Sequence, residues 1–466
     1  MVFSSNAFLF FFLPAVLIIY YLCRKNRTLS NAVLTVMSLL FYAWGEPKFV
    51  LVMLGSILLN WLIALFIDKS GDRHGRRKTL LVLGIIMNVC ILGVFKYTGF
   101  AVRNLNALGF RIVDPQIVLP IGISFFTFQA MSYIIDVYRG TAQCQKHFMG
   151  VCLYIAFFPQ LIAGPIVRYE TVAMEIQNRK ETVEDFTEGT RRFIVGLAKK
   201  AIIANALAAF VDRIYALPAA DTSVALTWLA AAAYLMQVYY DFSGYSDMAI
   251  GLGRMFGFHF LENFNIPFIS KTVAEFWRRW HISMCTWFRD YVFFPLGGSR
   301  VKSKLRLLFN MFMVWALTGL WHGAEWTFIC WGVGFFVIQA IEKLTGLGKF
   351  MEKHWYGHVY AMLFVVLITV MIRSASMTAA FDFYKTMFGF GGACFGNSYT
   401  LLMLREYGWA LIAGVICSLP TAQLIKKRVS ANTWEILSGA GVLLAGALAV
   451  ICVTSGSYNP FIYFNF

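Results

Sequence analysis

The sequence predicts an all-α membrane protein whose helices cross the bilayer many times. Of its 466 residues, 59% are hydrophobic and 17% are aromatic, and the mean hydropathy is +0.66. A soluble domain of this size does not carry so much apolar surface. Apolar runs of about 20 residues, the length of helix that crosses a bilayer, recur along the whole chain. We therefore expect a single transmembrane domain over residues 1–466.

About twelve segments are long and apolar enough to be candidate spans. Their boundaries are defined to within several residues, and they lie near residues 7–23, 29–44, 49–67, 79–97, 117–135, 193–215, 223–241, 306–321, 325–342, 357–373, 405–424 and 433–454.

Basic residues predict the orientation of these spans. Residues 1–6 have no positively charged side chain, whereas three basic residues follow the first apolar run at positions 24–27. Further basic clusters occupy residues 68–78 and 426–428. Lys and Arg hold loops on the cytoplasmic side, so we expect an uncleaved first helix and both termini on the extracytoplasmic side of the cell membrane.

The net charge of +16 follows from the same rule, and we do not interpret it as nucleic-acid binding. The nine cysteines are scattered singly without a CxxC pair. The sequence therefore predicts neither a disulfide framework nor a metal site.

Residues 148–168 are apolar but have basic residues on both sides. Pro159, Gly164 and Pro165 interrupt any helix there. A re-entrant hairpin fits both observations, because broken backbone at membrane depth is tolerated only inside protein or beside a wet cavity.

The most polar stretch, residues 170–192, is expected to form a cytoplasmic surface helix. Thr182 and Asp185 resemble a helix N-cap. Glu188 is spaced to pair with the two arginines that follow it.

Residues 275–289 are expected to form an amphipathic helix rich in Trp and Arg. Such helices lie in the membrane interface. His281 follows Trp277 and Arg278 by one turn and would share their face. Taken alone, His281 fits an interfacial histidine better than a catalyst.

The tripeptide Trp321-His322-Gly323 places a histidine between two long apolar runs. A titratable imidazole at or near membrane depth either has a buried partner or takes part in chemistry. A histidine that is hydrogen-bonded within a helical hairpin and a histidine that transfers protons explain the tripeptide equally well.

The distance along the chain from Arg306 to His322 favours a buried position. Those 16 residues make roughly 24 Å of helix, less than the roughly 30 Å hydrocarbon core. His322 is therefore expected in a depression within the membrane, where a cytoplasmic donor and an external acceptor can meet.

Residues 237–247 place two carboxylates, Asp241 and Asp247, among tyrosines at the end of an apolar span. Intramembrane carboxylates are functional candidates. The reading we favour is that they bond tyrosines and a neighbouring helix end.

Nine short motifs, in a fixed order along the chain, indicate a resemblance to one protein family. The chain resembles a membrane-bound O-acyltransferase of the alginate O-acetyltransferase type. The matching motifs are residues 1–5, 41–44, 119–129, 158–165, 240–247, 276–281, 290–298, 320–323 and 458–463.

The resemblance implies a helical fold around a funnel or tunnel that thins the membrane. It implies that His322 is essential for acyl transfer and that His281 lines the same tunnel. It also implies cytoplasmic acetyl-CoA as donor substrate, with no bound cofactor. The acetyl group is expected to pass to an extracytoplasmic acetyltransferase partner that modifies an exopolysaccharide or cell-wall polymer.

These arguments give His322 and His281 as candidate catalytic residues. The candidate substrate-binding residues are Trp277, Arg278, Tyr240, Asp241 and Trp321. Acyl transfer needs a base for the attacking hydroxyl and stabilisation of the oxyanion, and His322 can serve as that base. No Ser-His-Asp spacing is evident, so we expect direct transfer without a lasting acyl-enzyme.

Three alternatives stay open. The related D-alanyl transfer to teichoic acid is disfavoured by the first segment and the length of the chain. A transporter or channel with an intramembrane histidine relay also fits broken helices, although no internal repeat is visible. The third alternative is a non-enzymatic scaffold for polysaccharide export.

Overall fold

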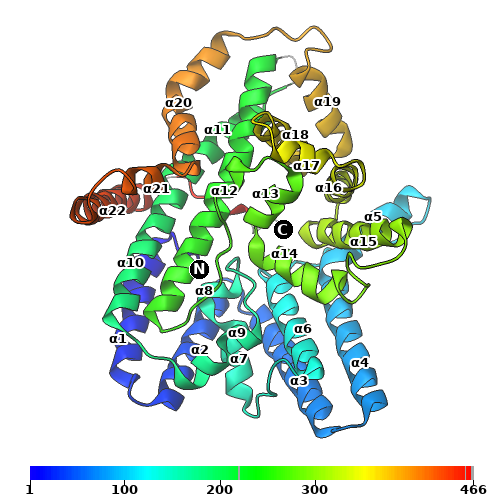
Figure 1. Cartoon of the computed structure of the whole chain (residues 1–466), viewed down its shortest axis with the longest axis vertical. Coiled ribbons are helices and arrows are strands. Elements are labelled where there is room, and N and C mark those ends of the chain that lie inside the picture. Colours follow the sequence, from blue (N-terminus) through cyan, green and yellow to red (C-terminus); the bar gives the residue numbers. More distant parts are fainter. Residues whose placement is uncertain (219–220, 457, 463–466) are drawn as a thin grey trace. The chain divides into compact units, whose positions relative to one another are not determined.

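The computed structural model describes residues 1–218, 221–456 and 458–462. Within these ranges the chain forms helices and loops without a β-strand (Figure 1). Among the described helices, six have the length and apolarity to cross a membrane: Phe49–Lys69, His74–Ala107, Val183–Tyr215, Trp326–Thr345, Ser398–Ser418 and Ala431–Thr454. The all-helical polytopic class is therefore confirmed, and the number of about twelve spans stays a prediction.

The chain gathers into two compact units. Unit 1 comprises Met1–Phe193 and Ser246–Leu261, and unit 2 comprises Ile194–Tyr245 and Glu262–Phe466. The long helices α10 (Val183–Ala198) and α12 (Val224–Met255) contribute residues to both units. The expectation of one domain over residues 1–466 stays a prediction.

Unit 1 is built on the N-terminal helices. They are η1 (Phe8–Phe12), α1 (Leu13–Cys23), α2 (Arg27–Ala43), α3 (Phe49–Lys69), α4 (His74–Leu92), η2 (Gly93–Tyr97), α5 (Thr98–Ala107), α6 (Ile123–Arg139), α7 (Phe148–Ala156), α8 (Phe158–Leu161) and α9 (Tyr169–Asn178). Buried Asn60 on α3 and Asn88 on α4 exchange two amide hydrogen bonds of 2.7 and 3.1 Å. Such pairs hold apolar helices together where hydrophobic driving force is absent.

The helix break expected within residues 148–168 is confirmed. Helix α7 ends at Ala156, and α8 begins with Pro159 near its N-terminus, because proline cannot donate the hydrogen bond that would continue α7. The buried amide of Phe158 instead donates to Ser38 Oγ at 3.1 Å. The position of this segment in the membrane stays a prediction.

The expectation of a single surface helix over residues 170–192 is wrong. Helix α9 ends at Asn178, and α10 starts a new helix whose N-cap is Thr182, with Asp185 N donating to Thr182 Oγ1 at 3.0 Å. That helix continues through η3 (Lys199–Ala204) and α11 (Asn205–Tyr215) as one continuous helical segment. The apolar residues beyond position 193 extend it past the polar stretch.

One of the two ion pairs expected from Glu188 is present. Arg191 lies 3.4 Å from Glu188, whereas Arg192 pairs with Asp247 at 2.9 Å. Asp247 therefore serves to hold α12 against α10 within unit 1.

Unit 2 contains the candidate site. After α12 come η5 (Pro267–Ile269), α13 (Val273–Arg279), α14 (Ile282–Phe288), η6 (Arg289–Phe293), α15 (Lys304–His322), α16 (Trp326–Thr345), α17 (Leu347–Glu352), α18 (Gly357–Arg373), α19 (Met377–Met387), α20 (Ser398–Ser418), α21 (Thr421–Lys426) and α22 (Ala431–Thr454). In Figure 1 the short helices α13 and α14 lie between α12 and the pair α15–α16.

Helices α15 and α16 form a hairpin with a close backbone contact. A Cβ on Gly332 would lie 2.6 Å from Trp315 O, and one on Gly319 would lie 2.7 Å from Phe328 O. Small residues at such crossings let helix backbones approach in a membrane protein. The two glycines therefore set the distance between α15 and α16.

We expect Gly332→Leu to destabilise the hairpin, because the added atoms meet backbone that cannot move aside. Overpacking of this kind costs about 1–3 kcal/mol. The measurement is the unfolding temperature of the purified protein in detergent. The matched control is Gly439→Leu on α22, where a Cβ meets nothing within 4 Å. A Gly332→Leu protein as stable as this control would contradict the tight crossing.

Candidate active site

A large cavity lies in unit 2. Its volume is about 1140 Å³, above the roughly 300–1,000 Å³ of ordinary ligand pockets. Helices α13 to α17 line it, with Trp277 and Arg278 among the lining residues. Neither His281 nor His322 is itself a lining residue, but Ile282, which follows His281, and Thr318 are.

Helix α13, which carries Trp277 and Arg278, is held at its N-terminus by Glu342 from α16. The Glu342 carboxylate accepts the backbone N–H groups of Val273 at 2.7 Å and Ala274 at 3.0 Å. A carboxylate at this position satisfies the orphan donors of the first turn and complements the helix dipole. Glu342 thus joins α16 to the N-terminus of α13, and both helices line the cavity.

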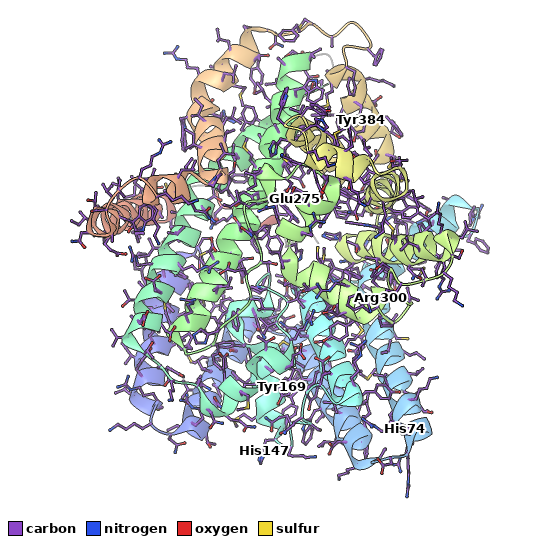
Figure 2. The ribbon with its side chains drawn as sticks, viewed as in Figure 1. His74, His147, Tyr169, Glu275, Arg300 and Tyr384 are labelled. Carbon is purple, nitrogen blue, oxygen red and sulfur yellow. The ribbon has the colours of Figure 1, made fainter. Side chains whose placement is uncertain are left out.

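Two further contacts set the start of α13. Thr272 caps the helix by accepting Glu275 N at 3.0 Å. Glu275, labelled in Figure 2, accepts Lys271 N and pairs with Arg279 one turn later, each at 2.9 Å.

The expected continuous helix over residues 275–289 is wrong, because the chain breaks at Trp280 and His281. Helix α13 ends at Arg279, and His281 has the left-handed backbone conformation φ 46°, ψ 51° before α14 begins. A non-glycine residue in this region costs about 1–3 kcal/mol, and such residues cluster at active sites. His281 therefore does not share the helical face of Trp277 and Arg278.

Asn263, which sequence reasoning missed, stabilises the break. Its backbone carbonyl accepts Ile282 N at 2.9 Å. Its side-chain oxygen accepts both Ser283 N at 3.2 Å and Ser283 Oγ at 2.9 Å. The loop between α12 and α13 carried no sequence signal that would assign Asn263 to His281.

The same amide oxygen fixes the tautomer of His281. Nδ1 lies 3.1 Å from Asn263 Oδ1, and because that atom only accepts, Nδ1 carries the proton. The basic lone pair is then on Nε2, which is buried without a hydrogen-bond partner among the described residues.

His281 is also uncharged. It is 1% exposed and lies outside the candidate membrane spans. Burial, with His322 nearby as a second cause, lowers the pKa of His281 well below its ordinary value. At neutral pH the ring therefore presents a neutral Nε2.

His322 ends α15 and has the same tautomer for a different reason. Its Nδ1 donates to the carbonyl of Thr318, one turn earlier, at 2.7 Å, so in the neutral ring the lone pair is on Nε2. The C-terminal end of a helix favours a cation. An imidazolium formed at His322 would therefore be stabilised by α15.

Gly323 keeps His322 in place through close packing. A Cβ on Gly323 would lie 2.1 Å from the Phe328 ring. This explains the glycine of the Trp321-His322-Gly323 tripeptide.

Aromatic rings connect the two histidines. The Trp321 ring lies 6.0 Å from His281 and 4.8 Å from His322 between ring centroids. On its other side His322 lies 4.8 Å from Trp331, whose ring is 5.7 Å from Trp277 at the cavity wall. The structure thus brings His281, His322, Trp321 and Trp277 into one cluster.

Arg278 lies at the cavity wall but faces solvent. Its guanidinium is 3.6 Å from Glu352, and both side chains are half exposed. Its candidate role in substrate binding stays a prediction.

Tyr240 and Asp241 contact other helices. Tyr240 OH donates to Gly414 O on α20 at 2.5 Å. Asp241 pairs with Lys200 at 2.7 Å and accepts Ile462 N at 2.9 Å. The next residue, Phe242, is the one that contacts His281, with ring centroids 4.6 Å apart. Asp241 thus pairs with a lysine and a backbone N–H, and not with the tyrosines and helix end that the sequence reading favoured. A substrate-binding role for either residue stays a prediction.

The last motif, residues 458–463, lies beside this pair. Lys200 Nζ donates to the carbonyl of Pro460, and the Phe461 ring packs 5.0 Å from Tyr245. Residue 463 lies outside the described residues. Among those that are described, no three His, Cys, Asp or Glu side chains are grouped to hold a metal ion.

Comparisons with known proteins show the family to which the chain is similar. The model of the membrane-bound O-acyltransferase family matches residues 145–378, which include both histidines. The probable alginate O-acetylase AlgI of Pseudomonas aeruginosa is 44% identical over 400 residues, covering 84% of this chain and 75% of that protein. The protein of the same name from Pseudomonas putida is 39% identical and covers 100% of both chains.

Two other relatives differ in their described activities. The peptidoglycan O-acetyltransferase of Helicobacter pylori is 30% identical and covers 100% of this chain and 98% of that protein. The teichoic acid D-alanyltransferase of Bacillus subtilis is 33% identical over 257 residues, covering 52% of this chain and 65% of that protein.

We expect Asp241→Asn to destabilise unit 2, because it leaves the buried Lys200 ammonium, which is 4% exposed, without its counter-ion. Breaking a buried pair in this way costs about 3–5 kcal/mol. The measurement is the unfolding temperature in detergent.

The double variant Lys200→Met, Asp241→Asn is the control, because it removes both charges and should recover part of the stability. A stable single variant that has lost substrate affinity would instead make Asp241 a binding residue.

Proposed function

The chain belongs to the membrane-bound O-acyltransferase family, and from that premise we propose that it transfers acetyl groups across the membrane for polysaccharide O-acetylation. The donor would be a cytoplasmic thioester and the acceptor an extracytoplasmic hydroxyl. The acyltransferase activity follows from family membership, while the acetyl group, the donor and the direction are the proposal.

One observation carries it: two histidines, joined by Trp321, lie beside a large cavity, and each is hydrogen-bonded through Nδ1. Attack of a hydroxyl on a thioester requires removal of the hydroxyl proton. A neutral imidazole whose Nδ1 is held as a donor has its lone pair on Nε2, which is suited to that task. Reacting groups must also approach within about 3–3.5 Å, which favours one shared site.

We assign the base to His322. The C-terminal end of α15 favours the positive charge that forms when His322 takes the proton. His281 is buried and neutral, so it suits a role in orienting the donor or accepting a hydrogen bond.

Acetyl-CoA is the proposed donor, and the charge of the cavity supports it. Four cations line the cavity against two carboxylates: Arg278, Arg289, Lys343, Lys349, Glu342 and Glu352. An excess of positive charge favours the phosphates of a coenzyme.

The proposed acceptors are an extracytoplasmic acetyltransferase partner and, through it, an exopolysaccharide or cell-wall polymer. The alginate O-acetylases and the peptidoglycan O-acetyltransferase cover three quarters or more of this chain. The D-alanyltransferase similarity covers about half. Acetyl transfer is therefore favoured over D-alanyl transfer.

The proposed topology has about twelve spans in the cell membrane and both termini outside. The basic clusters at residues 24–27, 68–78 and 426–428 support it.

We expect His322→Gln to lower acetyl transfer by about 10²–10⁴-fold, the usual contribution of a general base, while the protein still folds. Glutamine keeps polarity but cannot accept a proton at neutral pH. The measurement is thiol release from acetyl-CoA by purified protein, together with the acetyl content of exported polymer.

His354→Gln is the matched control. His354 makes the same kind of bond, from Nδ1 to the carbonyl of Phe350 one turn earlier at 2.8 Å, and is not a cavity residue. Full turnover in the His322 variant would sink the assignment of the base.

A second test concerns the termini. Single cysteines at the exposed positions Asn6 and Ser455, in a variant lacking the nine native cysteines, should react with an impermeant thiol reagent in intact cells. Position 457, the alternative near the C-terminus, lies outside the described residues. Labelling that occurs only after lysis would reverse the proposed orientation.

A further inference from the structure

Two N–H groups at the cavity wall have no acceptor among the described residues. They are Trp277 Nε1 on α13 and Gln339 Nε2 on α16, and both atoms are buried. A buried donor without a partner costs about 1–3 kcal/mol, and buried polar groups in folded proteins are nearly always satisfied. Two such donors in one cavity indicate that a ligand supplies the acceptors.

The Trp277 indole is held by rings on three sides. Its centroid lies 4.9 Å from Trp315, 5.7 Å from Trp331 and 5.0 Å from Phe335. With 6% of its surface exposed, it has no room to turn its N–H toward solvent. The donor is therefore a fixed feature of the wall.

Gln339 lies on the same side of α16 as two residues that contact α13. Phe335, one turn before it, touches Trp277, and Glu342, nearly one turn after it, bonds the start of α13. Residues at this spacing share a helix face. Gln339 is therefore flanked by two fixed contacts and faces the cavity from α16, as Trp277 does from α13.

The two donors differ from the charged groups of the cavity. Arg278, Arg289 and Lys343 suit anions, whereas an indole and a carboxamide are neutral. Apolar side chains such as Met284, Val314 and Trp315 surround them. The fitting ligand at this depth is a slender, mostly apolar chain that carries neutral carbonyl oxygens.

We propose that Trp277 and Gln339 bind the amide carbonyls of the donor's pantetheine-like arm. The assignment rests on the proposed function, because it takes the cavity to hold a thioester donor. A pantetheine-like arm has two amide carbonyls, and each carbonyl oxygen can accept from one of the two N–H donors. The thioester then lies beyond Trp277, toward Trp331 and His322.

The test compares two donors in Trp277→Phe and Gln339→Met, which remove the N–H groups and keep apolar bulk. One donor is S-acetylpantetheine and the other is an alkyl acetyl thioester of similar length without amides. We expect each variant to raise KM for S-acetylpantetheine about 5- to 10-fold with kcat kept, as for the loss of one neutral hydrogen bond. The alkyl thioester should be unaffected.

The matched control is Gln237→Met on α12, which removes another buried carboxamide, outside the cavity wall. It should leave both donors unchanged. Equal kcat losses with both thioesters would assign Trp277 and Gln339 to the reacting carbonyl and overturn the proposal, as would unchanged kinetics with either donor.

A binding experiment separates this proposal from the proposed function. Pantetheine without an acetyl group cannot react, so its equilibrium affinity is measured by calorimetry in the wild type and both variants. If both variants bind pantetheine 5- to 10-fold more weakly but the wild type transfers no acetyl group, the binding site is supported and the proposed acetyl transfer is refuted. Normal transfer with affinity unchanged in both variants would refute the site alone.

Two sources can deliver this arm, free coenzyme A and a carrier protein that bears the same group. Acetyl-CoA and an acetylated carrier protein are therefore assayed in parallel. The variants should weaken use of whichever one the wild type accepts, and an accepted donor insensitive to both variants would overturn the proposal.

Discussion

The contact between Gly319 and Gly332 is the constraint on which the site depends. Because no side chain separates the two backbones, Trp331 and Phe335 on α16 lie level with the last turns of α15. Trp277 of α13 packs against those two rings. The spacing of one helix pair thus sets the cavity wall, the indole N–H and the position of His322 together.

Much of this architecture could be predicted from local patterns. Apolar runs predicted helices, Thr182 predicted the start of α10, and Pro159 predicted the interruption after α7. Each of these features depends on residues within one or two turns of one another. The tripeptide around His322 could be chosen as a candidate site for the same reason, since a histidine between two apolar runs is unusual in composition; its catalytic role stays a prediction.

Contacts between distant residues could not be predicted in this way. Asn263 is 18 positions from His281, and Glu342 is 69 positions from Val273. The helical spacing of residues 275–289 therefore favoured a continuous helix, while Asn263 supplies the hydrogen bonds that allow a break. Asp241 is a second example. A carboxylate in an apolar span suggested a functional role, whereas its ion pair with the distant Lys200 accounts for its burial.

The ion pair between Lys200 and Asp241, with its hydrogen bonds to Pro460 and Ile462, has a consequence for biosynthesis. Both residues leave the ribosome long before Pro460 and Ile462, whose backbone groups complete their hydrogen bonds. Until then a charged pair sits in an apolar helix bundle without its full set of partners, a costly state. These two hydrogen bonds can therefore form only after the chain has been synthesised as far as Ile462. Nascent chains that stop short of this segment would expose a polar defect that protein quality control can recognise.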